Sequence, residues 1–570
     1  MTRHDETPAA TSKASMTGTA APGVFAAAGL IAVLTLVARV VGFGRWLVFS
    51  QSVGTTCVGS VYQAANQLPN VIFEVAAGGA LAAVVVPIIA GQLARPNSGA
   101  TQNSAEAAQT ASAMLTWTLA VLVPLSILMA ASARPLASFM VDDQRCSGST
   151  DLMASMIGVF SPQIALYGVG IVLAGVLQAH RRFLGVVLAP LLSSLVVMAA
   201  YLMFGALAQG KGNDLARLPS RASMALALGT TLGVAVLSLS LLIPVHRAGV
   251  RLRPTWTFPD GVARRASALA GAGLLALFAQ QVAVLVTLWV SQHRGGTGTL
   301  NVYVYAQAIY LLPYAVLAVP FAMSALPALA TGLDQAVLAT APAQASFARA
   351  QSTLASSARA IIVATSAGAA VLFAIASPTG AFFSALDAGR HNPHGIAALA
   401  ALPGALSAFA PGLVGFGMAA LLTRALYVQG RPAVAGGLVA LGWFIAAIVP
   451  LLVLQSDAGP RSTLIALGLA SSLGMTVAAL GLFVAVRRTW GVKAFRGFGR
   501  SAVVACGAGL FSAAVGRGLA AVLHPQGLVA GAVVAALVAV VVAMLFAGSI
   551  WIGDRGSARL ALAKLPGRAR

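Results

Sequence analysis

Long apolar runs recur along almost the whole chain, and they limit its possible folds more than any other feature. From residue 22 to residue 552, stretches of twenty or more mostly apolar residues follow one another, separated by short polar or basic loops. An α-helix needs about 20 apolar residues to cross a bilayer, and it satisfies its own backbone hydrogen bonds inside lipid. The sequence therefore predicts an all-α polytopic membrane protein.

The composition supports this fold class and excludes a soluble one. Of the 570 residues 59% are hydrophobic and only 8% are charged, whereas soluble domains carry about 25% charged residues. The formal net charge of +22 could suggest a nucleic-acid partner. The cations lie in short loops between apolar runs, however, and this is where a membrane-topology signal places them. We therefore expect no nucleic-acid partner.

The apolar runs can be divided at charged residues, Pro and Gly, and this division predicts fourteen transmembrane helices. Several runs are longer than a bilayer requires, which predicts tilted or kinked helices. The fourteen predicted spans are residues 22–50, 58–93, 108–133, 151–178, 184–208, 222–245, 266–292, 299–331, 352–377, 395–428, 432–455, 462–486, 501–523 and 527–552.

The distribution of Arg and Lys predicts the orientation of the chain. With the N-terminus inside, 24 of the 35 basic residues lie in inside segments, 9 lie outside and 2 lie within the first span. This asymmetry predicts a multi-pass protein of the cytoplasmic membrane with both termini in the cytoplasm. Cys57 and Cys146 then both lie outside. The sequence leaves open whether they form a disulfide or stay as two free thiols.

A weak internal repeat predicts two similar halves. "QLPNVIFEVAAGG" resembles "LLPYAVLAVPFAM", and "LQAHRRF" resembles "LYVQGRP"; the offsets are 244 residues from Pro69 to Pro313 and 249 residues from Arg182 to Arg431. Each offset crosses six predicted spans, which is typical of a transporter with its substrate site between two six-helix lobes. The predicted units are a tail at 1–21, lobes at 22–247 and 264–488, a helix pair at 500–552 and a basic tail at 553–570.

Two arginines in the first span are the leading candidates for a substrate site. Arg39 and Arg45 lie in "VARVVGFGRW", where a charge costs at least ~2.5 kcal/mol and normally faces water, a partner or a substrate. Snorkelling to the interface or a helix–helix salt bridge is the alternative. A bend at Gly42 and Gly44 could bring both side chains to one cavity. A guanidinium is also suited to a bidentate grip on phosphate.

The second predicted span carries one carboxylate and a polar stripe. Glu74 is either a counter-ion for the arginines, which we favour, or a proton or cation site. Gln63, Asn66, Gln67, Asn70 and Glu74 are spaced by three or four residues, so they share one helix face. Hydrogen bonding between helices would explain such a stripe, but five polar groups on one face favour a cavity lining. We therefore take Arg39, Arg45, Gln63, Asn66, Asn70 and Glu74 as candidate substrate-binding residues.

The sequence contains no enzyme signature that we could recognise. It has no Walker A glycine loop, no zinc-ligand spacing and no nucleophile elbow. We therefore expect a protein that is not an enzyme and has no cofactor and no bound metal.

Residues 25 to about 555 resemble the MurJ/MviN lipid II flippase family. The first span matches the family pattern S/A-R-x-x-G-x-x-R, and it is followed by "LPN" and by a small-residue run that ends in "VP". This resemblance implies the MOP exporter fold, with a groove formed by the last two helices. It also implies a flippase that moves lipid II, the undecaprenyl-pyrophosphate-linked peptidoglycan precursor, outward by alternating access. The implied partners are lipid II, membrane lipids and cell-wall synthesis proteins, and the resemblance assigns Arg39 and Arg45 to the anionic headgroup.

The chain also departs from the family pattern at charged positions. An acid early in the second helix aligns with Ser60, and two cavity arginines align with Phe73 and Ala308. The glutamate of the family's second helix aligns with Gly78, so Glu74 lies one helical turn earlier. The alternatives to lipid II flipping are a MOP-type exporter of another lipid-linked glycan or amphiphile, and a non-transporting scaffold of cell-wall assembly.

Overall fold

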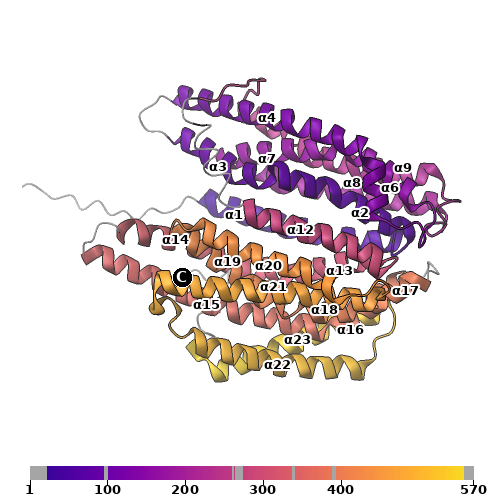
Figure 1. Cartoon of the computed structure of the whole chain (residues 1–570). Coiled ribbons are helices and arrows are strands. Elements are labelled where there is room, and N and C mark those ends of the chain that lie inside the picture. Colours follow the sequence, from indigo (N-terminus) through magenta and orange to yellow (C-terminus); the bar gives the residue numbers. More distant parts are fainter. Residues whose placement is uncertain are drawn as a thin grey trace, which may run out of the picture.

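The computed structural model describes residues 22–94, 100–259, 262, 274–336, 341–387 and 393–556, and within these ranges it contains helices and no strand. The predicted tail at 1–21 and most of the tail at 553–570 lie outside the described residues, as do residues 263–273 at the start of the second predicted lobe. Figure 1 shows a first group of helices, a second group beneath it and a final pair against the second group.

The helices of the first group are α1 (Pro22–Ser52), α2 (Cys57–Phe73), the π-helical turn η1 (Glu74–Gly78), α3 (Gly79–Leu93), α4 (Ala100–Ala131), α5 (Ala133–Met140), α6 (Ser149–Phe160), α7 (Gln163–Ala179), α8 (Phe183–Ala208), α9 (Ser220–Leu239) and α10 (Leu242–Arg247). Those of the second are α12 (Leu274–Val290), the π-helical turn η3 (Ser291–Gly295), α13 (Thr299–Pro313), the π-helical turn η4 (Tyr314–Ala318), α14 (Val319–Ala336), α15 (Ala341–Ala374), α16 (Ala376–Asp387), α17 (Pro393–Ala400), α18 (Leu402–Phe409), α19 (Gly412–Val428), α20 (Pro432–Val453) and α21 (Gly459–Trp490). The short 3-10 helix η6 (Val492–Phe495) leads to the final pair, α22 (Phe498–Leu523) and α23 (Leu528–Gly553).

Within the described residues, each predicted span overlaps one helix or a run of consecutive helices, and residues 266–273 of the seventh span lie outside them. Among the described residues, eleven helices are long and apolar enough to cross a membrane, and a twelfth joins them if the pair 395–409 and 412–428, bent by 47°, is one span. The first two predicted spans correspond to α1 and to the run α2–η1–α3. Neither is among the eleven membrane-crossing helices counted above. Fourteen membrane crossings therefore remain a prediction, while the all-helical membrane fold is confirmed.

The internal repeat predicted from the sequence has a structural counterpart. In the first copy Pro69 precedes the π-helical turn η1, and in the second Pro313 precedes η4. The junction α7–α8 has Arg181 at φ 56°, and the junction α19–α20 has Gly430, 249 residues later, at φ 67°. The positive-φ residues thus agree at the repeat offset, whereas the π-helical turns are shifted, because η1 begins five residues after Pro69 and η4 begins directly after Pro313.

An aromatic cluster joins the two groups of helices. Phe49 of α1 stacks on Tyr62 of α2 with ring centroids 5.7 Å apart, and it meets Tyr305 of α13 at 6.2 Å. Tyr305 in turn stacks on Phe383 of α16 at 5.1 Å. These four side chains are almost completely buried. Aromatic pairs contribute about 0.5–1.5 kcal/mol each beyond the area they bury, so the cluster holds the groups together.

Candidate functional site

The two arginines of α1 lie in different surroundings. Arg39 is exposed, whereas Arg45 is half-buried, with its guanidinium carbon 5.0 Å from the centroid of the Trp46 ring. Helix α1 continues as an α-helix through Gly42 and Gly44. A regular helix places residues six apart on different faces, in keeping with the different exposure of the two guanidinium groups.

Arg45 faces tyrosines of the first group. Its guanidinium interacts electrostatically with the phenol groups of Tyr62 on α2, Tyr167 on α7 and Tyr201 on α8. Tyr62 and Tyr201 are hydrogen-bonded to each other through their hydroxyls at 3.0 Å. The positive charge of Arg45 therefore acts on tyrosines of three helices of the first group.

The polar stripe of α2 lies on the same side. Asn70 is hydrogen-bonded to Tyr167, one of the tyrosines near Arg45. Gln63 is buried, and Asn66 is partly buried. Among the candidate residues, Nε of Arg45, Nε2 of Gln63 and Oδ1 of Asn66 are buried and have no hydrogen-bond partner in the part of the chain that the structure describes. Buried polar groups are normally satisfied, so these three atoms are candidates for contact with a ligand.

Glu74 begins the π-helical turn η1 and is half-buried. Its carboxylate lies over Gly78, because a Cβ atom added at Gly78 would be 2.5 Å from Oε2 of Glu74. The side chain at 74 thus occupies the space next to the position where the family resemblance places a glutamate. A π-helical turn often marks a functional site, and here it changes the direction of the residues after Asn70.

The counter-ion role that we favoured for Glu74 has no support in this conformation. Among the described residues, no ion pair joins Glu74 to Arg39 or Arg45. The family arginines are replaced by apolar packing: Phe73 is buried with its ring 5.7 Å from that of Tyr167, and Ala308 is half-buried on α13. Positive charge at the site therefore comes from α1.

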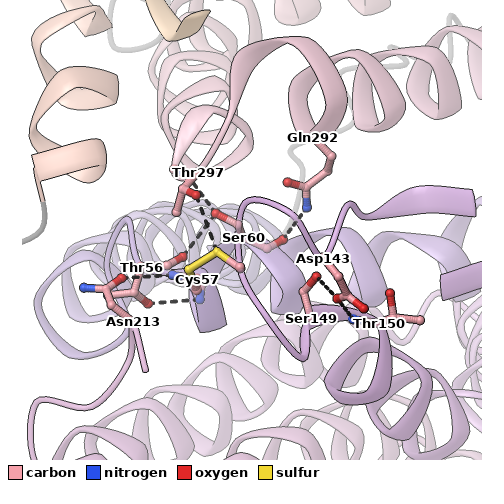
Figure 2. The surroundings of a disulfide bond; sticks show 12 residues. Thr56, Cys57, Ser60, Asp143, Ser149, Thr150, Asn213, Gln292 and Thr297 are labelled. Atoms are coloured by element: carbon pink, nitrogen blue, oxygen red, sulfur yellow. Dashed lines mark hydrogen bonds between the residues drawn. A yellow bond between two sulfur atoms is a disulfide. The ribbon is translucent and has the colours of Figure 1, made fainter. Parts of the chain in front are cut away.

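Ser60 belongs to the contact between the two groups of helices and not to the polar stripe. Its hydroxyl accepts the N–H of Gly298 at 2.8 Å, and its carbonyl accepts Nε2 of Gln292 at 3.0 Å (Figure 2). Nearby, Nδ2 of Asn301 donates to the carbonyl of Gly54 at 2.7 Å. Asn301 therefore ties α13 to the turn before α2.

Cys57 and Cys146 form a disulfide at this same end of the molecule, with Cα atoms 6.1 Å apart (Figure 2). The bond resolves the choice that the sequence left open. It ties the start of α2 to the loop between α5 and α6, in which Arg145 donates to the carbonyl of His293 at 2.7 Å. The disulfide thus braces a loop that contacts the second group.

The same loop is ordered by Asp143. Burial raises the pKa of its carboxyl, but hydrogen bonds from the backbone N–H of Thr150 and the hydroxyl of Ser149, each 2.8 Å long, outweigh burial and lower the pKa. No sequence pattern predicted this contact or the hydrogen bond from the hydroxyl of Thr55 to the carboxylate of Asp387, 2.5 Å long, which also joins the two groups.

A large apolar cavity of about 620 Å³ lies between the second group and α22. Its walls come from α15, α19, α21 and α22, and they include Phe373, Phe483 and Leu510. The free thiol of Cys506 also lines it. The cavity is suited to a hydrocarbon chain. It is lined by α22 and not by α23, whereas the family resemblance implied a groove formed by the last two helices.

Comparison with known proteins agrees with this arrangement. Residues 49–538 match the sequence model of the family described as lipid II flippase MurJ. A solved structure of lipid II flippase MurJ in an inward closed conformation has a TM-score of 0.68 and 16% identity, over 92% of this chain and 99% of that one. An inward-facing multidrug resistance MATE transporter of the MOP superfamily has a TM-score of 0.58 and 15% identity, over 80% of this chain and 94% of that one.

A Vibrio cholerae MATE transporter in a bent form is similar at a TM-score of 0.51 and 12% identity, over 81% of this chain and 95% of that one. These structures share the MOP fold with this chain, and the family match covers most of its length. The chain therefore belongs to the lipid II flippase MurJ family.

Proposed function

We propose that this chain flips lipid II with a site built from Arg39, Arg45, Gln63, Asn66, Asn70 and Glu74. The observation that carries the proposal is that Arg45, Gln63 and Asn66, all predicted from the sequence as site residues, each have a buried polar atom without a hydrogen-bond partner among the described residues. In this proposal Arg45 supplies the charge for the diphosphate, and the amides of α2 bind neutral parts of the headgroup. Charge-assisted hydrogen bonds from guanidinium to phosphate are about twice as strong as neutral ones.

Arg39 has a different role in the proposal. The Arg39 side chain is exposed, so it binds the incoming headgroup first. The headgroup then moves to the half-buried Arg45, six residues further along α1. Two separate cations suit a transport path better than one fixed clamp, because the substrate must leave as well as bind. The lobe contacts at Ser60, Asn301 and Thr55 close the opposite end during loading.

The apolar cavity between α15, α19, α21 and α22 holds the polyprenyl tail in this mechanism. Its volume of about 620 Å³ and the hydrocarbon side chains along it support that assignment. Cys506 provides a native probe, since its thiol lines the cavity. Lipid II should slow alkylation of Cys506 in nanodiscs, whereas a water-soluble headgroup analogue without the tail should not. Equal alkylation rates with and without lipid II would remove the tail from this cavity.

The orientation with both termini in the cytoplasm follows from the charge distribution and is part of the proposal. Reporter tags at residues 10 and 562 should both be read from the cytoplasm, and a tag near residue 146 should be read from outside. The disulfide at Cys146 fits an oxidising exterior. A tag at residue 146 that is accessible only from the cytoplasm would contradict the assignment.

Depletion and complementation test the function directly. In a strain depleted of its own flippase, this chain should restore the fraction of lipid II in the outer leaflet. Phe73 and Ala308, which stand where relatives carry cavity arginines, favour a second candidate, the export of another amphiphile. A well-inserted chain that leaves lipid II in the inner leaflet would favour that alternative.

A further inference from the structure

Besides the apolar cavity, a polar cavity lies where α22 begins and α23 ends, away from the candidate lipid II site. It has a volume of about 590 Å³ and is lined by Arg359, Arg500, Arg555 and Asp554, together with Ile552 and two glycines. Three arginines against one carboxylate leave a net charge of two positive units in the lining. A cavity of this charge selects an anionic ligand.

The single carboxylate is already engaged by groups within the cavity. Asp554 is buried; its Oδ1 lies 3.5 Å from Nη2 of Arg359, and its Oδ2 accepts the hydroxyl of Ser501 at 2.6 Å. Nε of Arg359 donates to the same hydroxyl at 3.0 Å. Asp554 therefore fixes Arg359 in the wall, while Arg500 and Arg555 are exposed at the rim.

Two features at the rim favour an anion: a guanidinium held in place by a backbone carbonyl, and the N-terminus of α22. Arg500 donates through Nη2 to the carbonyl of Gly553 at 3.0 Å, which holds its guanidinium across the gap between α22 and α23. Helix α22 begins at Phe498, and its N-cap residue Gly497 provides no side chain to cap the first N–H groups. Helix N-termini attract anions for this reason.

An apolar stripe continues from the cavity along α22. Val503, Gly507, Leu510 and Ala514 are exposed and lie on the same helix face as Arg500, at spacings of three and four residues. Val503 and Leu510 are each 75% exposed, and Ile552 at the cavity edge is 81% exposed. In a membrane protein such a face contacts acyl chains. The arrangement thus places hydrocarbon contacts directly beyond an arginine-rich pocket.

We propose that this cavity binds the phosphate headgroup of an anionic phospholipid, whose acyl chains lie along the exposed stripe of α22. Basic pockets between membrane helices are suited to such headgroups. The site is separate from Arg39 and Arg45, so it goes beyond the flipping of lipid II. It fastens the ends of α22 and α23 to the anionic leaflet.

Native mass spectrometry of the purified full chain tests the site. Phosphatidylglycerol should bind and raise the Tm, whereas zwitterionic phosphatidylcholine should bind at least tenfold more weakly. The double variant Arg500→Gln, Arg555→Gln should lose at least tenfold in affinity for phosphatidylglycerol. It should keep the Tm of the lipid-free protein, because the Arg359–Asp554 pair is untouched. The matched control is Arg487→Gln with Arg488→Gln, two exposed arginines at the end of α21 outside the cavity.

Three outcomes would overturn the proposal. They are equal binding by the double variant and the wild type, equal binding of the two phospholipids, and displacement of phosphatidylglycerol by millimolar inorganic phosphate. The last result would assign the cavity to a free anion. Flipping activity is not the readout, so a failure here leaves the role of Arg39 and Arg45 unaffected.

Discussion

At the scale of single residues, the arginines of α1 can be separated by their surroundings. Arg45 is half-buried with an unpartnered Nε, so Arg45→Ala should reduce outer-leaflet lipid II at least tenfold while the protein still inserts. Arg45→Lys should restore activity only in part, because Lys lacks the planar two-donor fork. Arg39 is exposed, so Arg39→Ala should lower the rate less. The measurement is complementation of the depleted strain, with membrane abundance determined in parallel.

Arg217→Ala is the matched control for both substitutions. Arg217 forms an exposed ion pair with Asp214 at 3.6 Å, and such pairs contribute about 0–1 kcal/mol. This variant should therefore flip normally. Normal growth with a well-expressed Arg39→Ala, Arg45→Ala double variant would remove the headgroup role and favour the scaffold hypothesis.

The role of the Glu74 carboxylate can be tested by moving the carboxylate from position 74 to position 78. Because this carboxylate lies over Gly78, Glu74→Ala should impair flipping and the added change Gly78→Glu should restore part of the activity. The single change Gly78→Ala should also impair flipping, since its Cβ would meet the Glu74 carboxylate. Flipping rate in proteoliposomes is the measurement. If Glu74→Ala is fully active, no carboxylate is needed at this turn.

The sequence was sufficient to single out the candidate polar residues but not their contacts. Arg45, Gln63 and Asn66 stood out because polar groups are costly inside a membrane span. The position of Ser60 in the lobe contact could not be predicted, since its partners Gln292 and Gly298 are more than 230 residues away. The electrostatic interaction of Arg45 with Tyr201 likewise depends on how α1 packs against α8.

At the scale of elements, the disulfide gives a simple prediction. Without reductant, the denatured protein should take up one alkylating group, on Cys506, and after reduction it should take up three. Mass spectrometry of the intact chain counts these groups. The two cysteines are 89 residues apart in the sequence. Removing a native disulfide typically lowers the free energy of unfolding by about 2–5 kcal/mol. Cys57→Ser should therefore lower the Tm, while Cys506→Ser should not. Three reactive thiols without reductant would contradict the pairing.

At the scale of the whole molecule, the sequence predicted the architecture better than the limits of its helices. Apolar runs predicted the helices and the repeat predicted two lobes, because both patterns are local or simply periodic. The π-helical turns η1, η3 and η4 and the extra helix α16 were not predicted. Apolar composition does not change where a helix shifts its hydrogen-bond register, so these interruptions depend on packing between helices.

The closed contact between the lobes provides the last prediction, because it must break when the transporter opens at that end. Gly298 has φ +83°, and a Cβ there would lie 3.0 Å from Cβ of Thr55 in the other group. Gly298→Ala should therefore push the lobes apart. Gly210→Ala is the matched control: Gly210 has a similar φ of +77°, but no atom lies within 4 Å of an added Cβ.

Both substitutions carry the same backbone strain of roughly 1–2 kcal/mol for a left-handed residue, so they differ by the contacts of the added Cβ with Thr55 of the other group and with Cβ of Ala398, 3.2 Å away in the same group. Spin labels at Gln144 and Asp457, which line a common cavity across the lobe contact, report the separation in a Cys506→Ser background. Gly298→Ala should add a population with longer label distances, and Gly210→Ala should keep the wild-type distribution. If the two variants give the same distribution, then backbone strain and not the contact with Thr55 governs the closed end.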